Sequence, residues 1–282
     1  MPAGPAGPHV RPGSPPDPLD DPLDEAALAA ACQTAGLRVT VVAETGSTNA
    51  DVGAAARMGE PAGLVIAAER QLAGRGRLAR DWVSPSGAGL TVSLLARPVV
   101  PVSRLGWLPM VVGTALVGTL RRRCEVAAVL KWPNDIQVAG EKLAGILVEL
   151  IAAPTGPPGL VIGFGLNVRT AAADLPAGAT SLAVLAGRGA ATAVPPRGEL
   201  LAELLTDLAG AVARFAADPN GARPAYRAVC ATLGLDVRVE LPGGETVVGV
   251  ATDVDEAGRL VVDGRAFSAA DIIHLRPAPT PS

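Results

Sequence analysis

A run of strand-like segments joined by tight turns occupies the middle of the chain and sets its fold class. Apolar segments rich in β-branched residues alternate here with turn residues, and they cover 126–132, 136–138, 143–151 and 160–168. Pro133, the Ala139-Gly140 pair and a Pro/Gly-rich segment separate them, and connections this short join antiparallel neighbours. The centre of the molecule is therefore predicted to be an antiparallel meander.

Helix-forming patterns flank this meander. Thr48, with Asp51 three residues later, resembles an N-cap and its capping-box partner, and Ser103 is placed to cap a second helix. Helices are expected at 24–35, 49–57, 103–123, 198–217 and 221–232, and further strands at 38–43, 64–69 and 90–97. The predicted fold class is α+β, with a mixed, largely antiparallel sheet and helices packed on one side of it.

The pattern changes near Gly234. From 235 to 276, short alternating strands are separated by glycine turns, without a helix-length period, which suits a small SH3-like β-barrel. Proline is frequent at the amino terminus, with eight in the first 22 residues, and no core-forming pattern occurs there. The expected domains are a disordered Pro-rich tail (1–22), a main domain (23–233), the C-terminal barrel (234–276) and a short disordered tail (277–282).

Charge and composition exclude several classes of function. A formal net charge of −3 argues against a protein that coats nucleic acid, so no nucleic-acid partner is expected. No apolar run reaches the roughly 18 residues that a membrane span needs, and the amino terminus lacks the pattern of a secretory signal. Three widely spaced cysteines and two histidines fit neither a disulfide framework nor a zinc site. A cytoplasmic protein without a membrane partner is predicted.

Of the 24 basic residues only Lys131 and Lys142 are lysines, which suggests that an ammonium group is needed in this segment. The string KWPND, which begins at Lys131, puts a cation, an aromatic ring, a rigid turn, an amide and a carboxylate within five residues. Such a set could hold a nucleobase and a magnesium-bound phosphate. A proline turn pinned by a Lys131–Asp135 ion pair explains the same residues equally well. Lys142 interrupts an apolar strand, so it either extends to solvent or points into a cleft.

A long loop rich in arginine and glycine follows the strand that ends near residue 69. Between 69 and 82 it interleaves four arginines with two glycines. Glycine lets backbone amides approach an anion closely, and arginine pairs with carboxylate or phosphate oxygens. The loop is not a P-loop, because the chain lacks GxxxxGK[ST]. A solvated surface loop or an RGG-like RNA contact remains an alternative interpretation.

Two shorter segments are weaker signals. The string TGSTN, from Thr45 to Asn49, offers hydroxyls and an amide at a helix start, although helix capping alone explains them half the time. The string GFGLNV, from Gly163 to Val168, is a strand whose glycines leave room for a ligand or a neighbouring backbone, and plain packing is the simpler explanation.

Taken in order, the strings ETGSTN, AERQLAGRGRLARDW, KWPNDI, KLAGILVE and GFGLNV resemble the biotin protein ligases, or biotin–[acetyl-CoA-carboxylase] ligases. The resemblance covers about residues 40 to 232, and 235–276 fits the carboxy-terminal barrel of that family. One departure is Ala79, where the family often has glycine. Family members that double as repressors carry an amino-terminal winged helix-turn-helix. The segment before Thr48 is too short for that domain, so the monofunctional type is implied.

The resemblance implies an enzyme that activates biotin with ATP and Mg²⁺ to biotinyl-5′-adenylate, releasing pyrophosphate. The biotinyl group then passes to one lysine of a biotin carboxyl-carrier domain, the expected protein partner. A monomer or weak homodimer is expected. Alternatives are a lipoate ligase or transferase of the same architecture, and a non-enzymatic biotin-responsive regulator.

The resemblance also implies site residues. Those for biotin are Ser47, Thr48, Asn49, Gln71, Gly74, Arg75, Gly76, Arg77 and Lys142. Among them Ser47, Thr48 and Gln71 would read the ureido ring, while Lys142, Arg75 and Arg77 would act on the reacting carboxylate and phosphate. Those for the nucleotide are Trp82, Lys131, Asn134 and Asn167, and Asp135 would help to hold magnesium.

Overall fold

The computed structural model describes residues 21–77, 80–152, 158–241, 244–268 and 271–274. Most of the predicted amino-terminal tail and all of 277–282 therefore lie outside the described residues. Asp21 and Pro22, which were assigned to that tail, are described. None of the described helices is long and apolar enough to cross a membrane.

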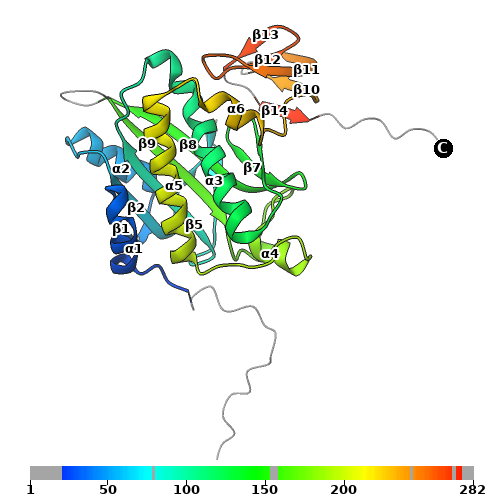
Figure 1. The fold of residues 1–282 in the computed structure, drawn as a ribbon. Helices are drawn as coiled ribbons and strands as arrows, with labels where there is room; N and C mark the ends of the chain where they lie inside the picture. Colours follow the sequence, from blue (N-terminus) through cyan, green and yellow to red (C-terminus); the bar gives the residue numbers. More distant parts are fainter. Residues whose placement is uncertain (1–20, 78–79, 153–157, 242–243, 269–270, 275–282) are drawn as a thin grey trace, which may run out of the picture.

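A seven-stranded sheet forms the main part of the molecule, with strand order β1-β2-β5-β9-β8-β7-β6 (Figure 1). Its strands are β1 (Arg38–Thr45), β2 (Leu64–Gln71), β5 (Gly89–Ala96), β6 (Val129–Lys131), β7 (Asp135–Val138), β8 (Glu141–Ile151) and β9 (Gly159–Asn167). β1 and β2 are parallel, and every other neighbouring pair is antiparallel. The predicted α+β fold with a mixed, largely antiparallel sheet is confirmed, and the meander from β6 to β9 is its larger half.

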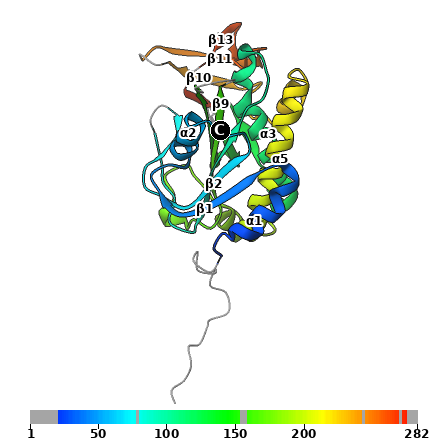
Figure 2. The ribbon, with the colours of Figure 1, turned by 90° about the vertical axis from the view of Figure 1, so that its left-hand side faces the viewer.

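The long helices cover one face of this sheet. The α-helices are α1 (Glu25–Cys32), α2 (Thr48–Arg57), α3 (Leu108–Cys124), α4 (Leu182–Gly187), α5 (Arg197–Ala217) and α6 (Ala222–Arg227), and 3-10 helices lie at Gln33–Ala35, Val102–Trp107 and Ala172–Asp174. Figure 2 views the sheet nearly edge-on, with α1, α3 and α5 on one side and α2 on the other. The expected one-sided packing thus applies to the long helices, and α2 has the opposite face of the sheet.

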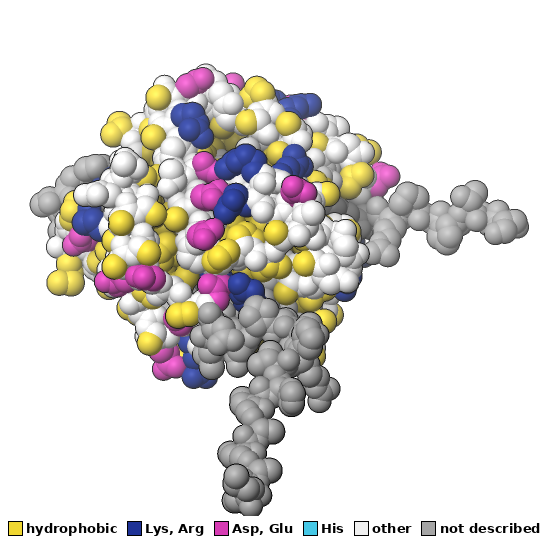
Figure 3. All heavy atoms as spheres, turned by 60° about the horizontal axis from the view of Figure 1, so that its bottom comes forward, with side chains coloured by type: hydrophobic (Ala, Val, Ile, Leu, Met, Phe, Trp, Pro, Cys, Tyr) yellow, Lys and Arg dark blue, Asp and Glu magenta, His cyan; other side chains and the backbone are white. Residues whose placement is uncertain are grey.

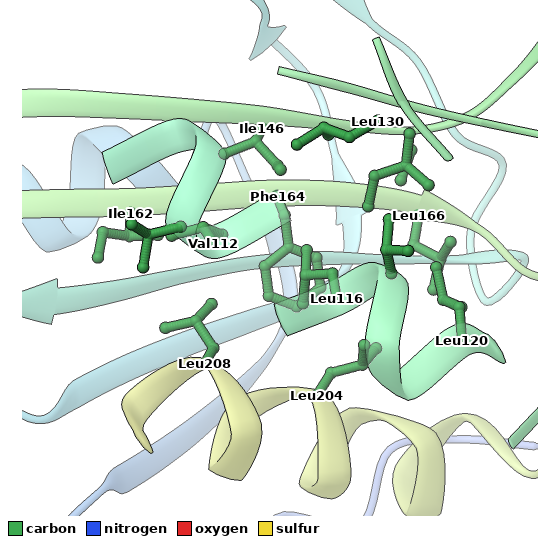
Figure 4. Packing of buried hydrophobic residues seen from close by; sticks show 14 of the residues in the cluster. Val112, Leu116, Leu120, Leu130, Ile146, Ile162, Phe164, Leu166, Leu204 and Leu208 are labelled. Carbon is green, nitrogen blue, oxygen red and sulfur yellow. The ribbon is translucent and has the colours of Figure 1, made fainter. Parts of the chain in front are cut away.

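Residue alternation along β9 explains this division. Leu160, Ile162, Phe164 and Leu166 point toward α3 and α5, where they join the main hydrophobic core (Figure 4). Val161 points to the opposite face, where a smaller cluster forms around α2. Burying each large aliphatic or aromatic side chain contributes about 1.5 to 3 kcal/mol, so the face toward α3 and α5 supplies most of the stability of the sheet.

Helix starts differ from the sequence prediction in two places. Ser47, not Thr48, caps α2, because its side chain accepts from the Ala50 backbone N–H. Asp51 does not close a capping box and instead accepts a hydrogen bond from Thr45 Oγ1. Ser103 lies inside the 3-10 helix Val102–Trp107, and α3 begins only at Leu108. Pro109 in the first turn of α3 suits a helix start because proline has no N–H to leave unpaired.

Short helices were the least predictable elements. α4 had no expected counterpart, and α6 ends at Arg227 rather than extending to residue 232. The region 70–89, predicted to be a loop, contains a small hairpin of β3 (Gly74–Arg75) and β4 (Asp81–Trp82). Such two-residue strands leave almost no periodicity in a sequence.

The carboxy-terminal segment forms a separate five-stranded antiparallel sheet, with strand order β13-β12-β11-β10-β14. Its strands are β10 (Asp236–Glu240), β11 (Thr246–Val254), β12 (Leu260–Val262), β13 (Arg265–Phe267) and β14 (Asp271–His274). The turn before β12 docks on the main domain, where the backbone carbonyls of Asp255 and Gly258 accept hydrogen bonds from Trp107 Nε1 and Trp132 Nε1. Hydrogen bonds from the side chains of Trp107 and Trp132 thus hold the predicted SH3-like segment against the main domain.

The first described residue, Asp21, is held by a partly buried ionic cluster around Arg197. Its carboxylate accepts from the Arg197 backbone N–H at 2.9 Å and pairs with Arg169 at 2.8 Å. The Arg197 side chain is fully buried and pairs with Glu69 at 2.8 Å. The prediction that the disordered tail extends to residue 22 is therefore wrong for Asp21.

On the face of the molecule shown in Figure 3, acidic and basic side chains lie intermixed, as expected for a net charge of −3.

Candidate active site

A cavity of about 320 Å³ opens on the face of the sheet that carries α2. Twelve of the residues predicted for the site line it: Ser47, Thr48, Asn49, Gln71, Arg75, Gly76, Arg77, Trp82, Lys131, Asn134, Asp135 and Lys142. They come from the start of α2, the end of β2, the β3–β4 hairpin and the strands β6 to β8. The fold thus brings together segments that lie far apart in the sequence.

Two predicted site residues do not line the cavity. Gly74 lies in β3, and a Cβ there would meet the Trp82 carbonyl oxygen at 2.4 Å, so this position serves the packing of the hairpin. Asn167 is buried at the end of β9, and its amide donates to the Thr180 carbonyl at 3.0 Å. In this structure Asn167 therefore packs at the end of its strand, as the simpler interpretation of GFGLNV had it.

The amino-terminal turn of α2 contacts the end of β2. The Thr48 backbone N–H donates to Gln71 Oε1 at 2.8 Å, and Thr48 Oγ1 lies 3.0 Å from the same oxygen. Thr48 is 3% exposed, so few of its polar contacts are with water. The two segments therefore form one polar wall of the cavity.

Two residues that sequence reasoning missed extend this wall. Ser93 in β5 places its hydroxyl oxygen 2.8 Å from Thr48 Oγ1 and 2.6 Å from Asn49 Oδ1. Asn49 Nδ2 donates to a Glu149 carboxylate oxygen in β8 at 2.7 Å. A buried hydroxyl inside an otherwise apolar strand was a signal for Ser93. Nothing local distinguishes Glu149, because its partner is 100 residues away.

Glycines on this face of the sheet admit side chains from elsewhere. A Cβ at Gly163 would lie 2.0 Å from Asn49 Oδ1, and a Cβ at Gly165 would lie 2.2 Å from the Trp82 ring. The string GFGLNV thus leaves room for two neighbouring side chains, where the sequence had suggested a ligand or a backbone.

The arginine-rich segment is folded against the cavity. Gly76 N–H donates to the Arg80 carbonyl at 2.6 Å, which closes the turn between β3 and β4. Arg77 Nη1 donates to Asn134 Oδ1 at 3.4 Å, which links the segment to the KWPND string. Arg75, Arg77 and Arg80 all line the cavity. Three guanidinium groups beside one cavity favour an anionic ligand.

Lys142 points into the cavity rather than to solvent at the strand edge. Its Nζ pairs with Asp135 at 2.7 Å and lies 5.8 Å from the centre of the Trp82 ring. The side chain is 37% exposed, so the ammonium can still be reached from the cavity. Asp135 places a single carboxylate on the cavity wall, which is the group there that could contact a cation. The described residues contain no cluster of three or more His, Cys, Asp or Glu side chains suited to a metal.

Comparison with known proteins supplies the identity of this arrangement. Residues 55–167 match the Biotin/lipoate A/B protein ligase family, and residues 232–275 match the Biotin protein ligase C terminal domain. The chain is 42% identical to the biotin–[acetyl-CoA-carboxylase] ligase of Mycobacterium tuberculosis, over 92% of this chain and 98% of that protein. The chain belongs to the biotin protein ligase family.

Two further similarities agree with membership of this ligase family. The biotin–[acetyl-CoA-carboxylase] ligase of Paracoccus denitrificans is 34% identical, over 80% of this chain and 94% of that protein. The structure of the biotin protein ligase from Aquifex aeolicus in complex with biotin and ATP superposes with a TM-score of 0.69 at 25% identity, over 85% of this chain and 99% of that one. The fold and the enzyme class expected from the sequence are thus those of its relatives.

Proposed function

We propose that this protein is an ATP-dependent biotin protein ligase. A carboxylate oxygen of biotin attacks the α-phosphorus of ATP, and the bond from that phosphorus to the bridging oxygen of pyrophosphate breaks. The product is the mixed anhydride biotinyl-5′-adenylate. A lysine amine of a carboxyl-carrier domain then attacks the biotinyl carbonyl, loses a proton and displaces AMP.

One observation carries this proposal: a cavity lined both by hydroxyl and amide groups and by cationic groups, in a chain of this family. Lys142, Arg75 and Arg77 would stabilise negative charge as the carboxylate approaches the phosphate. Cations fixed in a partly enclosed site stabilise such developing charge more strongly than water does. These three are the proposed catalytic residues.

The polar wall formed by the start of α2 and the end of β2 suits the ureido ring of biotin. A cyclic urea has two N–H donors and one carbonyl acceptor, so it needs both acceptors and donors from the protein. Ser47, Thr48, Asn49 and Gln71 offer both kinds of group there. We assign this wall to biotin, with Gly76 and the arginines beside its carboxylate.

For the nucleotide we propose Trp82, Lys131 and Asn134. Trp82 Nε1 is buried and has no hydrogen-bond partner among the described residues, so an acceptor on a bound ligand would satisfy it. Asn134 lines the cavity and donates its amide to the Ile146 carbonyl at 2.7 Å, which holds the side chain in place. For Asn167, a contact with adenine requires a local rearrangement, because this side chain does not line the cavity.

Asp135 is the proposed magnesium residue. Magnesium is commonly held by one or two carboxylates together with substrate phosphates, and a single carboxylate on the cavity wall fits that arrangement. The ion would neutralise phosphate charge. Its arrival would also compete with the Lys142–Asp135 ion pair, which leaves Lys142 available to the α-phosphate.

The decisive experiment combines the purified protein, biotin, magnesium-ATP and the carrier domain of an acetyl-CoA carboxylase. We expect pyrophosphate release and a biotinylated carrier, with no labelling when the acceptor lysine of the carrier is changed to arginine. Replacing biotin by lipoate tests the alternative, because a lipoate ligase would release pyrophosphate with lipoate rather than with biotin. Absence of biotin transfer in a folded preparation would overturn the proposal. We place the reaction in the cytoplasm, where such carriers would be met.

A further inference from the structure

A line of polar side chains leads from the cavity wall to the surface of the sheet. It runs from Thr48 through Ser93 and Asn49 to Glu149, with successive polar atoms 2.8, 2.6 and 2.7 Å apart. Thr48, Ser93 and Asn49 are buried, whereas Glu149 is exposed. The line therefore has one end at the proposed biotin site and the other at a carboxylate in water.

The carboxylate end fixes the orientation of Asn49. An ionised carboxylate only accepts hydrogen bonds, so Asn49 must present its NH₂ group to Glu149 and its carbonyl oxygen to Ser93. The absence of a side chain at Gly163 gives Asn49 room to lie there. The 2.6 Å contact is the shortest of the line and joins Ser93 to a pure acceptor, so the Ser93 proton belongs to it.

The orientation of Ser93 then fixes that of Thr48. Because a hydroxyl has one proton, Ser93 can only accept across its 2.8 Å contact with Thr48, and the Thr48 proton points at Ser93. Gln71 Oε1 accepts from the Thr48 backbone N–H at 2.8 Å and also lies 3.0 Å from Thr48 Oγ1, within reach of the hydroxyl proton. The shorter 2.8 Å contact between the two hydroxyls is a hydrogen bond only if that proton lies toward Ser93. Thr48 Oγ1 thus offers only lone pairs to a ligand.

We propose that Glu149 and Ser93 are positioning residues that set the donor and acceptor pattern of the biotin site. Glu149 acts through Ser93 to make Thr48 a hydrogen-bond acceptor, while Gln71, with its oxygen occupied, presents its NH₂ group. An acceptor next to a donor complements the adjacent N–H and C=O of a cyclic urea. This inference rests on the proposed function, because it concerns how the same cavity selects its substrate.

The test changes the hydrogen-bonding character of residue 149 and follows biotin-dependent pyrophosphate release. Glu149→Lys puts a donor where the acceptor was, so the Asn49 amide turns over and the orientation of the whole line reverses. We expect the KM for biotin to rise about tenfold, the scale of one lost hydrogen bond, with kcat and the KM for ATP nearly unchanged. Glu149→Gln retains an acceptor and should restore most of the affinity. Glu60→Lys is the matched control: it makes the same charge change on the surface, at a residue paired with Arg38 outside the cavity.

A double-mutant cycle with Ser93→Ala tests whether Glu149 acts on Thr48 through Ser93 or only disturbs its own surroundings. Ser93→Ala breaks the line, so Glu149→Lys should have almost no further effect on the KM for biotin in that background. Multiplicative effects of the two changes, or a KM for biotin in Glu149→Lys equal to that of the wild type, would overturn the inference. Failure of the wild-type protein to release pyrophosphate with biotin would instead overturn the proposed function. A calorimetric titration with biotin alone reports the same shift without catalysis.

Discussion

The two faces of β9 differ in almost every side chain they present. Toward α3 and α5 the strand offers Leu160, Ile162, Phe164 and Leu166, all of them buried in the main core. Toward the cavity it offers the two glycines over which Asn49 and Trp82 lie. The face toward α3 and α5 therefore contributes stability. On the face toward the cavity, glycines leave space for side chains from distant segments to lie against the strand. Substitutions on the two faces should separate folding from activity.

The largest expected effect on folding is on the helix-covered face. Leu204 in α5 is 1% exposed and belongs to the buried cluster of Figure 4. Leu204→Ala should lower the free energy of unfolding by about 2 to 5 kcal/mol, because it removes buried contacts and leaves a cavity. Denaturant titration measures this change. The rate of pyrophosphate release per folded molecule should stay near the wild-type value, and a proportional loss of both would contradict the separation of the faces.

The largest expected effect on activity is at Lys142. Lys142→Ala should slow adenylate formation by about 10²-fold or more, the usual scale for one preorganised electrostatic group. Its ion pair with Asp135 is partly exposed, so the free energy of unfolding should change by less than about 1 kcal/mol. Single-turnover pyrophosphate release measures the rate, and titration with biotin alone should still detect binding. A near-normal rate would remove Lys142 from the mechanism.

A smaller effect is expected where Trp82 lies over Gly165. Gly165→Ala places a Cβ 2.2 Å from the indole ring, so the ring must move. We expect the KM for ATP to rise about tenfold, as for one lost favourable contact, while the KM for biotin changes little. The matched control is Gly118→Ala in α3, where the nearest atom to the new Cβ is Arg122 Nη1 at 3.7 Å. That change should raise stability by about 0.5 to 1 kcal/mol and leave both KM values unchanged. Equal loss of ATP binding in both variants would refute the assignment.

The smallest effect is a pH dependence on the helix-covered face. Burial raises the pKa of Asp207, but hydrogen bonds from Thr119 and Arg122 and the nearby arginine charges outweigh it and hold the pKa below the ordinary value of 3.8. A carboxylate with a lowered pKa stabilises the folded protein above its unfolded pKa, and this contribution disappears as the pH falls through the folded pKa. Asp207→Asn should therefore cost less than about 1 kcal/mol at pH 7, because the ion pair is partly exposed. The difference from wild type should vanish in strong acid when unfolding is measured as a function of pH, while ligation at pH 7 stays unchanged.

The sequence predicted regular strands well and contacts between distant segments poorly. Long apolar runs gave the meander, and ordered motifs gave most of the cavity wall, because both are written in local patterns. The short helix α4 and the two-residue strands carry too few residues for a period to show. Thr48 was preferred to Ser47 as the cap because Asp51 stands three residues after it, but Asp51 binds Thr45 instead and Ser47 accepts the Ala50 N–H.

Site residues that depend on tertiary contacts were missed for a related reason. Ser93 and Glu149 contact partners more than 40 residues away, so the sequence beside Glu149 indicates no role, and Ser93 is marked only by its hydroxyl within a mostly apolar strand. Gly74 and Asn167 fit the motifs but do not line the cavity. A motif states which residue types occur together, and the sheet register decides which of them face the same side.

The fastening of Asp21 has a consequence for how the chain is made. Asp21 and its partner Arg197 are 176 residues apart, and Arg197 also pairs with Glu69 at the end of the strand that carries Gln71. At about 5 to 20 residues per second, a ribosome needs roughly 9 to 35 seconds to deliver Arg197 after Asp21 has been synthesised. Until then the Glu69 carboxylate lacks its arginine, and the Asp21 carboxylate has only Arg169 to pair with. The amino-terminal segment can therefore be completely fixed to the main domain only after the start of α5 has left the ribosome.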